Sequence, residues 1–247
     1  MLYRTGLTPL TFPFQLVVWM WILNTQVWGS EFVPGLAPLS FMLPYVRHNN
    51  TCYDLKRVTL AVFSGVAEIY VLEDWWCGVI ILFGMYFCSR ISMIFCLVGS
   101  FIGTMYGFVV GVDLDIIFLG LYGYNSSLCA IALGGFFLVV SGWRMLTFVV
   151  LFSVLAAVVN GATAAFFKPF GLAILTWPFA FATWVGVLAS VKRPFIKNVE
   201  LDVLSTPEDH RKIYGIRPNN SIVPATTTVV FLENSTRQMQ RNSGPPP

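Results

Sequence analysis

Long apolar stretches separated by short polar breaks dominate the chain up to residue 190. Six of them approach the length of a membrane span, at residues 10–28, 75–89, 91–112, 125–140, 145–160 and 173–190. About 20 consecutive apolar residues are enough for a helix to cross the hydrocarbon core of a bilayer. The pattern therefore predicts an all-α polytopic membrane protein with about six membrane-spanning helices.

Two further apolar segments are too short or too interrupted for an ordinary span. Residues 58–72 contain Glu68 in otherwise apolar surroundings, and residues 111–125 are broken by glycines. Both patterns favour short re-entrant or pore-lining helices. An ionisable side chain inside a membrane is costly and is usually retained for function, so Glu68 is a candidate pore residue. The alternative is that this short segment lets Glu68 reach interfacial water.

The composition narrows the class of protein. The 247-residue chain is 56% hydrophobic and 11% charged, whereas soluble domains are about a quarter charged. The five cysteines include no CxxC pair, and His48 and His210 have no ligand-spaced partner. We therefore expect no metal and no cofactor, and the lack of a nucleophile–base arrangement argues against an enzyme. The net charge of +3 comes mostly from the tail, which suggests a cytoplasmic tail rather than binding of nucleic acid.

The charged residues also orient the predicted spans. When the connections are assigned alternately to two sides, one side receives Arg4, Arg90, Arg144 and the pair Lys192-Arg193. Because cytoplasmic loops carry the excess of lysine and arginine, this side is predicted to be cytoplasmic, with the C-terminal tail. The opposite side receives the sequon at Asn49, which is therefore a candidate glycosylation site.

A short motif occurs at both ends of the apolar region. Thr11-Phe12-Pro13-Phe14 lies in the first span and Thr176-Trp177-Pro178-Phe179 in the last. The predicted topology makes the two copies antiparallel, which is typical of an inverted repeat whose binding site lies where broken helices meet. Since proline removes a helical hydrogen bond, freed carbonyls such as that of Ile174, together with the threonine hydroxyls, would suit a neutral solute rich in N–H donors. The alternative is chance recurrence around a tolerated kink, with each threonine bonded to its own helix.

Several longer runs resemble a known family. The run DIIFLGLYGYNSSLCAIALGGFFLV, followed by GLAILTWPFAFAT, resembles the C-terminal half of the urea transporters. GVAEIYVLEDWWCGVIILFG resembles the preceding pore segment, with Glu68 where Gln is usual. LTPLTFPFQLVVW resembles the last helix of the N-terminal half, with Gln15 where Asn is usual, and STPEDHRKIYG resembles the tail after the last span. The resemblance covers roughly residues 7–215.

This resemblance implies passive, channel-type transport of urea in single file through an aromatic-lined pore, by a trimer of subunits that each hold a pore. We expect a homotrimer if the missing half is present, in the plasma membrane. It also implies two sets of site residues. The pore contacts would be Thr11, Phe14, Glu68, Thr176 and Phe179. The structural motif residues would be Pro13, Gly120, Gly123, Asn125 and Pro178.

The resemblance divides the chain into four segments. Residues 1–30 would hold the last helix of the first inverted half, residues 31–57 an extracellular loop, residues 58–190 the second half with its pore helices, and residues 191–247 a cytoplasmic tail that is disordered toward its end. Most of the first half has no counterpart here, so we expect an incomplete product of a longer gene, with a second GLxGYN motif in frame upstream of Met1. The alternative functions are a pore for another small neutral solute, such as ammonia or a short amide, and a non-conducting membrane protein that assembles with full-length relatives.

Overall fold

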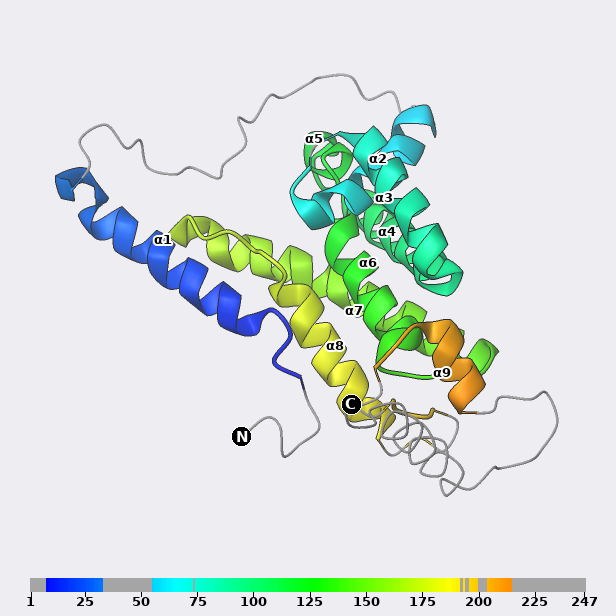
Figure 1. The fold of residues 1–247 in the computed structure, drawn as a ribbon. Coiled ribbons are helices and arrows are strands. Elements are labelled where there is room, and N and C mark those ends of the chain that lie inside the picture. The colour runs from blue at the N-terminus through cyan, green and yellow to red at the C-terminus, as the bar shows by residue number, and fades with distance from the viewer. Residues whose placement is uncertain are drawn as a thin grey trace, which may run out of the picture.

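The computed structural model describes residues 8–32, 55–72, 74–191, 193, 196–199 and 204–214, which are almost entirely helical (Figure 1). In chain order the helical elements are α1 (Phe12–Phe32), α2 (Leu55–Ala67), the 3-10 turn η2 (Glu68–Tyr70), α3 (Trp75–Cys88), α4 (Arg90–Val110), α5 (Leu114–Phe118), α6 (Gly123–Ile131), the π-helical turn η3 (Ala132–Phe136), α7 (Trp143–Phe167), the 3-10 turn η4 (Lys168–Phe170), α8 (Trp177–Ser190) and α9 (Pro207–Ile213). The predicted glycosylation site Asn49 lies outside the described residues, as does the tail beyond residue 214.

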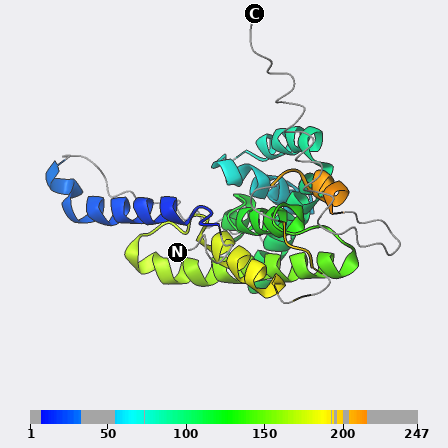
Figure 2. The ribbon, with the colours of Figure 1, turned by 60° about the horizontal axis from the view of Figure 1, so that its bottom comes forward.

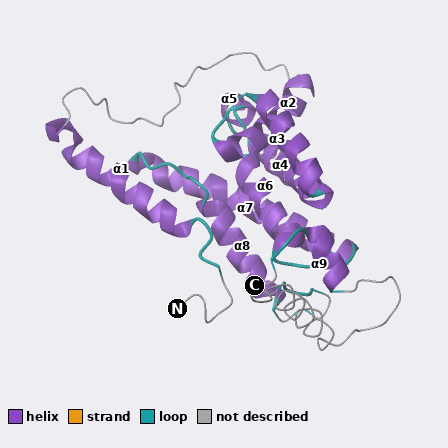
Figure 3. Ribbon diagram, in the orientation of Figure 1, coloured by secondary structure: helices purple, strands orange, loops and turns teal. Residues whose placement is uncertain are grey.

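The apolar helices fall into two length classes. Three runs are long and apolar enough to cross a membrane, at Arg90–Val110, Leu114–Phe136 and Trp143–Phe170. Three shorter apolar helices cover Phe12–Asn24, Trp75–Cys88 and Trp177–Ser190. In the described part of the chain the β pairing is limited to one isolated bridge between Leu138 and Asn198, in keeping with the helices and loops of Figure 3. These features agree with an all-α membrane protein, while the number of spans and the re-entrant helices remain predictions.

Close approach of backbones joins α4 to α6. Gly99 and Gly103 face α6, and a methyl group added at either would collide with the backbone of Ser126 or Tyr122. Two helices with small residues at their contact can pack this closely without a side chain between them. Gly99, Gly103, Gly107 and Gly111 recur every four residues. The last of them, Gly111, instead ends α4 in a left-handed conformation with φ of 76°.

Buried hydroxyl groups add polar contacts between the same helices. The Ser126 hydroxyl on α6 donates to the Ser153 carbonyl of α7 at 3.0 Å. The Ser127 hydroxyl, next in sequence, lies 3.1 Å from the Cys96 carbonyl of α4. All these side chains lie among apolar neighbours, where unpaired polar groups are costly. The small polar residues of α6 therefore fix its position between α4 and α7.

The position of α6 organises the rest of the fold. It packs against α2, α4, α7 and α8, so it is the central helix of this bundle. By contrast, α1 projects away from the bundle with its first turns beside α8, as two views of the ribbon show (Figures 1 and 2). The junction of α1 with α8 therefore joins the N-terminal helix to the bundle.

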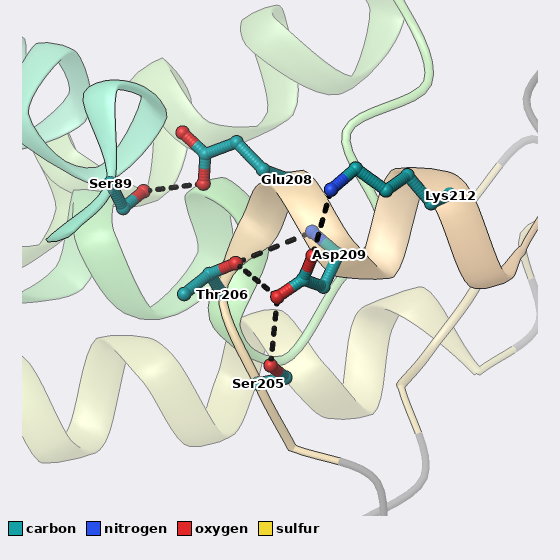
Figure 4. Close-up of polar contacts among 6 residues, drawn as sticks. All are labelled: Ser89, Ser205, Thr206, Glu208, Asp209 and Lys212. Atoms are coloured by element: carbon teal, nitrogen blue, oxygen red, sulfur yellow. Dashed lines mark hydrogen bonds and ion pairs between the residues drawn. The ribbon is translucent and has the colours of Figure 1, made fainter.

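The short helix α9 docks against the start of α4. Glu208 accepts a hydrogen bond from the Ser89 hydroxyl at 2.7 Å (Figure 4). It also accepts one from the Ile91 N–H at 3.0 Å. Partial burial disfavours the Glu208 carboxylate, but these hydrogen bonds more than offset it and lower the pKa of Glu208. The buried His210 ring adds a contact between α9 and η3, because its Nδ1 lies 2.8 Å from the Gly135 carbonyl. Its Nε2 accepts a hydrogen bond from the Ser205 N–H.

Candidate functional site

The two copies of the Thr-aromatic-Pro-Phe motif begin α1 and α8. Pro13 and Pro178 are each the second residue of their helix, Phe12–Phe32 and Trp177–Ser190. The first N–H groups of a helix have no internal partner, so proline costs no hydrogen bond at this position. The expectation that these prolines interrupt helices is therefore wrong, as is the predicted start of the last span at residue 173. Ile174 precedes α8, so its carbonyl lies outside the helix and proline does not deprive it of a helical hydrogen bond.

The residue before each threonine has the same unusual backbone conformation. Leu10 has φ of 49° and Leu175 has φ of 53°. This left-handed conformation costs a residue with a Cβ roughly 1–2 kcal/mol. The matching φ values indicate that the two segments share one backbone conformation, with a sharp turn directly before the threonine.

Reciprocal hydrogen bonds join the two copies. Trp19 and Trp184 lie at the same distance in sequence after their threonines. The Trp19 indole donates to the Ala173 carbonyl at 2.9 Å, and the Trp184 indole donates to the Thr8 carbonyl at 2.9 Å. Ala173 and Thr8 in turn occupy matching positions before the threonines. The contact is thus the same in both directions, as it is across a twofold axis.

Aromatic rings follow the same reciprocal pattern. Phe12 lies edge-on to Trp184 with ring centroids 5.5 Å apart, and its counterpart Trp177 lies edge-on to Trp19 at 6.2 Å. Phe12 and Trp177 also contact each other, at 5.7 Å. Rings in these tilted and edge-to-face arrangements attract one another beyond the effect of burial alone. These rings give one side of the junction between α1 and α8 an apolar surface.

At the centre of the junction the two threonines meet. The hydroxyl oxygens of Thr11 and Thr176 lie 2.8 Å apart, in hydrogen-bond contact. The Gln15 amide nitrogen, one turn further along α1, donates to both oxygens at 2.9 and 2.8 Å. The three side chains form a closed polar triangle. Sequence reasoning placed both threonines at this site but assigned no role to Gln15.

A second polar network holds the turn before Thr176. The Leu175 carbonyl accepts from the Tyr124 hydroxyl at 2.6 Å and from the Asn125 amide at 3.2 Å. Asn125 also donates to Asn160 at 2.8 Å, and its oxygen accepts from the Phe179 N–H at 3.3 Å. That N–H belongs to the first turn of α8, which has no internal partner for it. Asn125, in the GLYGYN run, therefore caps the start of α8 although it lies on a different helix, α6.

The glycines of the same run allow α6 to approach α2. Gly120 has φ of 85°, and a methyl group there would collide with the backbone of Ser64 and Gly65. Gly123 similarly faces the Gly65 backbone and the Ser100 hydroxyl. These glycines place Tyr124 and Asn125 beside the start of α8.

The remaining predicted pore residues occupy different environments. Phe179 is buried in the core cluster, whereas Phe14 is 62% exposed on α1, so the two phenylalanines do not meet. Glu68 is half-buried in the turn after α2 and lies near enough to Tyr124 to interact electrostatically. Tyr124 also binds the Leu175 carbonyl, so it contacts the turn that carries Thr176. The matching tryptophans after each motif were the overlooked sequence signal for this junction.

The chain is similar to known proteins over most of its length. The family model "Urea transporter" matches residues 1–191. The chain is 27% identical over 215 residues to "Urea transporter 1" of Capra hircus and of Ovis aries, and 26% identical over the same length to that of Mus musculus. These alignments cover 86% of this chain and 55% of each relative, so the chain spans about half the length of the curated relatives it matches. The family match over most of its length shows that the chain belongs to the urea transporter family.

Proposed function

We propose that this protein carries urea passively across a membrane, along a path that passes the junction of α1 and α8. The observation that supports this most directly is the triangle of Thr11, Thr176 and Gln15. It collects hydroxyl and amide groups where two apolar helices begin, beside a cluster of aromatic rings. Side chains of these two kinds are the ones that a small amide needs when it leaves water.

The chemistry of urea fits such a site. Urea is neutral and planar, with four N–H donors and one carbonyl acceptor, so leaving water costs it several hydrogen bonds. Threonine oxygens accept N–H groups and threonine hydroxyls donate to a carbonyl, which replaces part of that loss. The rings of Phe12 and Trp177 offer flat apolar surfaces to a flat solute. Tyr124 and Glu68 would extend the polar contacts along the path.

The proposal extends to the assembly and its orientation. The reciprocal contacts of the two motif copies support an inverted repeat, with α1 as the last helix of the first half. We further propose a homotrimer in the plasma membrane, with a cytoplasmic C-terminus and glycosylation at Asn49. The many large apolar side chains exposed on α1, including Val17 and Met20, suit contact with lipid or with further protein.

The direct test is urea flux measured by stopped-flow light scattering on proteoliposomes. Thr176→Val keeps the shape of the side chain but removes the hydroxyl that meets Thr11 and Gln15. Leaving a buried donor or acceptor unpaired costs about 1–3 kcal/mol, so we expect urea permeability to fall at least about fivefold. Thr147→Val is the matched control, because the Thr147 hydroxyl is exposed and bonds only to its own helix, at the Trp143 carbonyl.

One observation favours a different function. The threonine oxygens are in contact at 2.8 Å, which leaves no space for a solute between them. A non-conducting protein that assembles with longer relatives would have such a closed junction. Absence of urea flux from the unaltered protein would favour this alternative. Flux that Thr176→Val leaves unchanged would instead place the path elsewhere.

A further inference from the structure

Gln15 is an unusual residue in the junction because its side chain is only half satisfied. It is 0% exposed, and its amide nitrogen donates to both threonine oxygens. Its amide oxygen, Oε1, is also buried but has no hydrogen-bond partner in the described part of the chain. A buried carbonyl normally has a partner, so this oxygen is open to a water, a ligand or a group that a movement brings to it.

Counting donors and acceptors shows what the triangle leaves unused. The two Gln15 N–H groups occupy one lone pair on each threonine oxygen, and one threonine hydroxyl donates to the other. Of the two hydroxyl hydrogens, one has no place inside the triangle. The unused groups are therefore this single O–H donor, one lone pair on the donating threonine and both lone pairs of Gln15 Oε1. Three acceptor positions against one donor complement a solute that has more donors than acceptors, as urea does.

The glutamine side chain itself resembles the solute. Its carboxamide is a carbonyl bonded to an NH₂ group, which is the chemical unit that urea and short primary amides present. With both N–H groups bound to the threonines, this carboxamide makes the contacts that the NH₂ group of a permeating amide would make. A solute can therefore use the threonine pair only after Gln15 releases it.

On the basis of the proposed function, we propose that Gln15 is a specificity-determining gate that binds the threonine pair in place of the permeating amide. When it turns away, two threonine oxygens lose a donor at the same time. A solute with an NH₂ group can replace both donors at once, as urea does. A solute such as N,N′-dimethylurea carries a single N–H on each nitrogen. One of its nitrogens therefore cannot donate to both threonine oxygens. The gate thus favours primary amides through hydrogen bonding as well as size.

The two motif copies differ at this position. Ala180 lies at the place in the second copy that matches Gln15 in the first, and it is also fully buried. The chain thus supplies one carboxamide to the threonine pair, and the reciprocal contacts around the pair are otherwise repeated on both sides. Gln15→Ala would give both copies the same residue and leave the threonines without a competing amide.

Permeability ratios test the gate, because a ratio does not depend on the amount of active protein. Stopped-flow traces of proteoliposomes would give the permeability of N,N′-dimethylurea relative to urea for the unaltered protein, Gln15→Ala and Gln15→Met. Methionine keeps a similar volume without N–H groups. Because one hydrogen bond contributes a factor of about 2 to 12, we expect the ratio to rise by that factor in both variants. Thr147→Val should leave it unchanged.

The outcomes separate this inference from the proposed function. If the unaltered protein conducts urea and neither variant changes the ratio, Gln15 is no gate, while the proposed function stands. A rise in Gln15→Ala alone would mean that the glutamine acts by filling space, which overturns the role of its carboxamide. Urea flux that appears only in the two variants would support the gate. No urea flux in the unaltered protein or any variant would refute both proposals.

Discussion

The substitution Asn125→Ala tests the network that holds the start of α8. Asn125 is 0% exposed and makes three hydrogen bonds, to Asn160, to the Leu175 carbonyl and from the Phe179 N–H. After the change, the Leu175 carbonyl keeps its bond from Tyr124. The Asn160 oxygen and the Phe179 N–H lose the contacts described here and remain in a buried site.

The expected cost follows from those two groups. A buried group left unpaired costs about 1–3 kcal/mol, although bonds between membrane helices average only about 0.6 kcal/mol, with a maximum near 1.7. With about 1–2 kcal/mol for each of the two groups, which lies where these ranges overlap, we expect Asn125→Ala to lower the free energy of unfolding by about 2–4 kcal/mol. Because Leu175 precedes Thr176, the same change should also lower urea flux.

The assay is unfolding of the purified protein by titration with SDS in mixed micelles, followed by tryptophan fluorescence and far-UV circular dichroism. Thr147→Ala, which removes one exposed hydroxyl, is the control and should cost less than about 0.5 kcal/mol. Asn160→Ala completes a double-mutant cycle with Asn125→Ala, and the two effects should be less than additive. A cost for Asn125→Ala no larger than that of the control would refute the reasoning.

Three further predictions concern the glycine turn, the reciprocal contacts and the tail. Gly120→Ala should abolish folding, because Gly120 has φ of 85° and a methyl group there would meet the backbone of α2. The loss would be seen as disappearance of the monodisperse peak in size-exclusion chromatography. Gly142→Ala is the control and should remain folded, because Gly142 has φ of 132° but no atom lies within 4 Å of the added methyl group. Trp184→Phe keeps a ring but loses the indole N–H that donates to the Thr8 carbonyl, just before α1, and should cost about 0.5–1.5 kcal/mol in the SDS titration, whereas the same change at the exposed Trp143 should cost less. Partial burial opposes ionisation of Glu208, but its hydrogen bonds to the start of α4 hold its pKa below the ordinary value of 4.5. Its contribution to docking of α9 is therefore complete above pH 4.5 and is lost as the pH falls through the lowered value. Hydrogen exchange at the start of α4 should show this pH dependence, and Glu208→Gln should remove it.

Much of the architecture is predictable from local patterns. Apolar runs predicted α3, α4 and α7 within a few residues of their starts, since a helix in an apolar environment needs no partner for its own backbone. The four-residue spacing of Gly99 and Gly103 is visible in the sequence, and these two glycines pack against α6. The repeated motif likewise singled out Thr11 and Thr176, because four matched residue types are visible without any structure.

By itself, the sequence determined the helical class, the approximate segments and the two threonine motifs, all of which depend on residues close together in the chain. Only the tertiary structure decided how those segments meet. It showed that Pro13 and Pro178 begin helices rather than break them, because the turns at Leu10 and Leu175 come first. It also brought Gln15 to both threonines, a contact that spans 161 residues to Thr176. Hydrogen bonds depend on distance and direction in space, and no local pattern specifies them over such a separation.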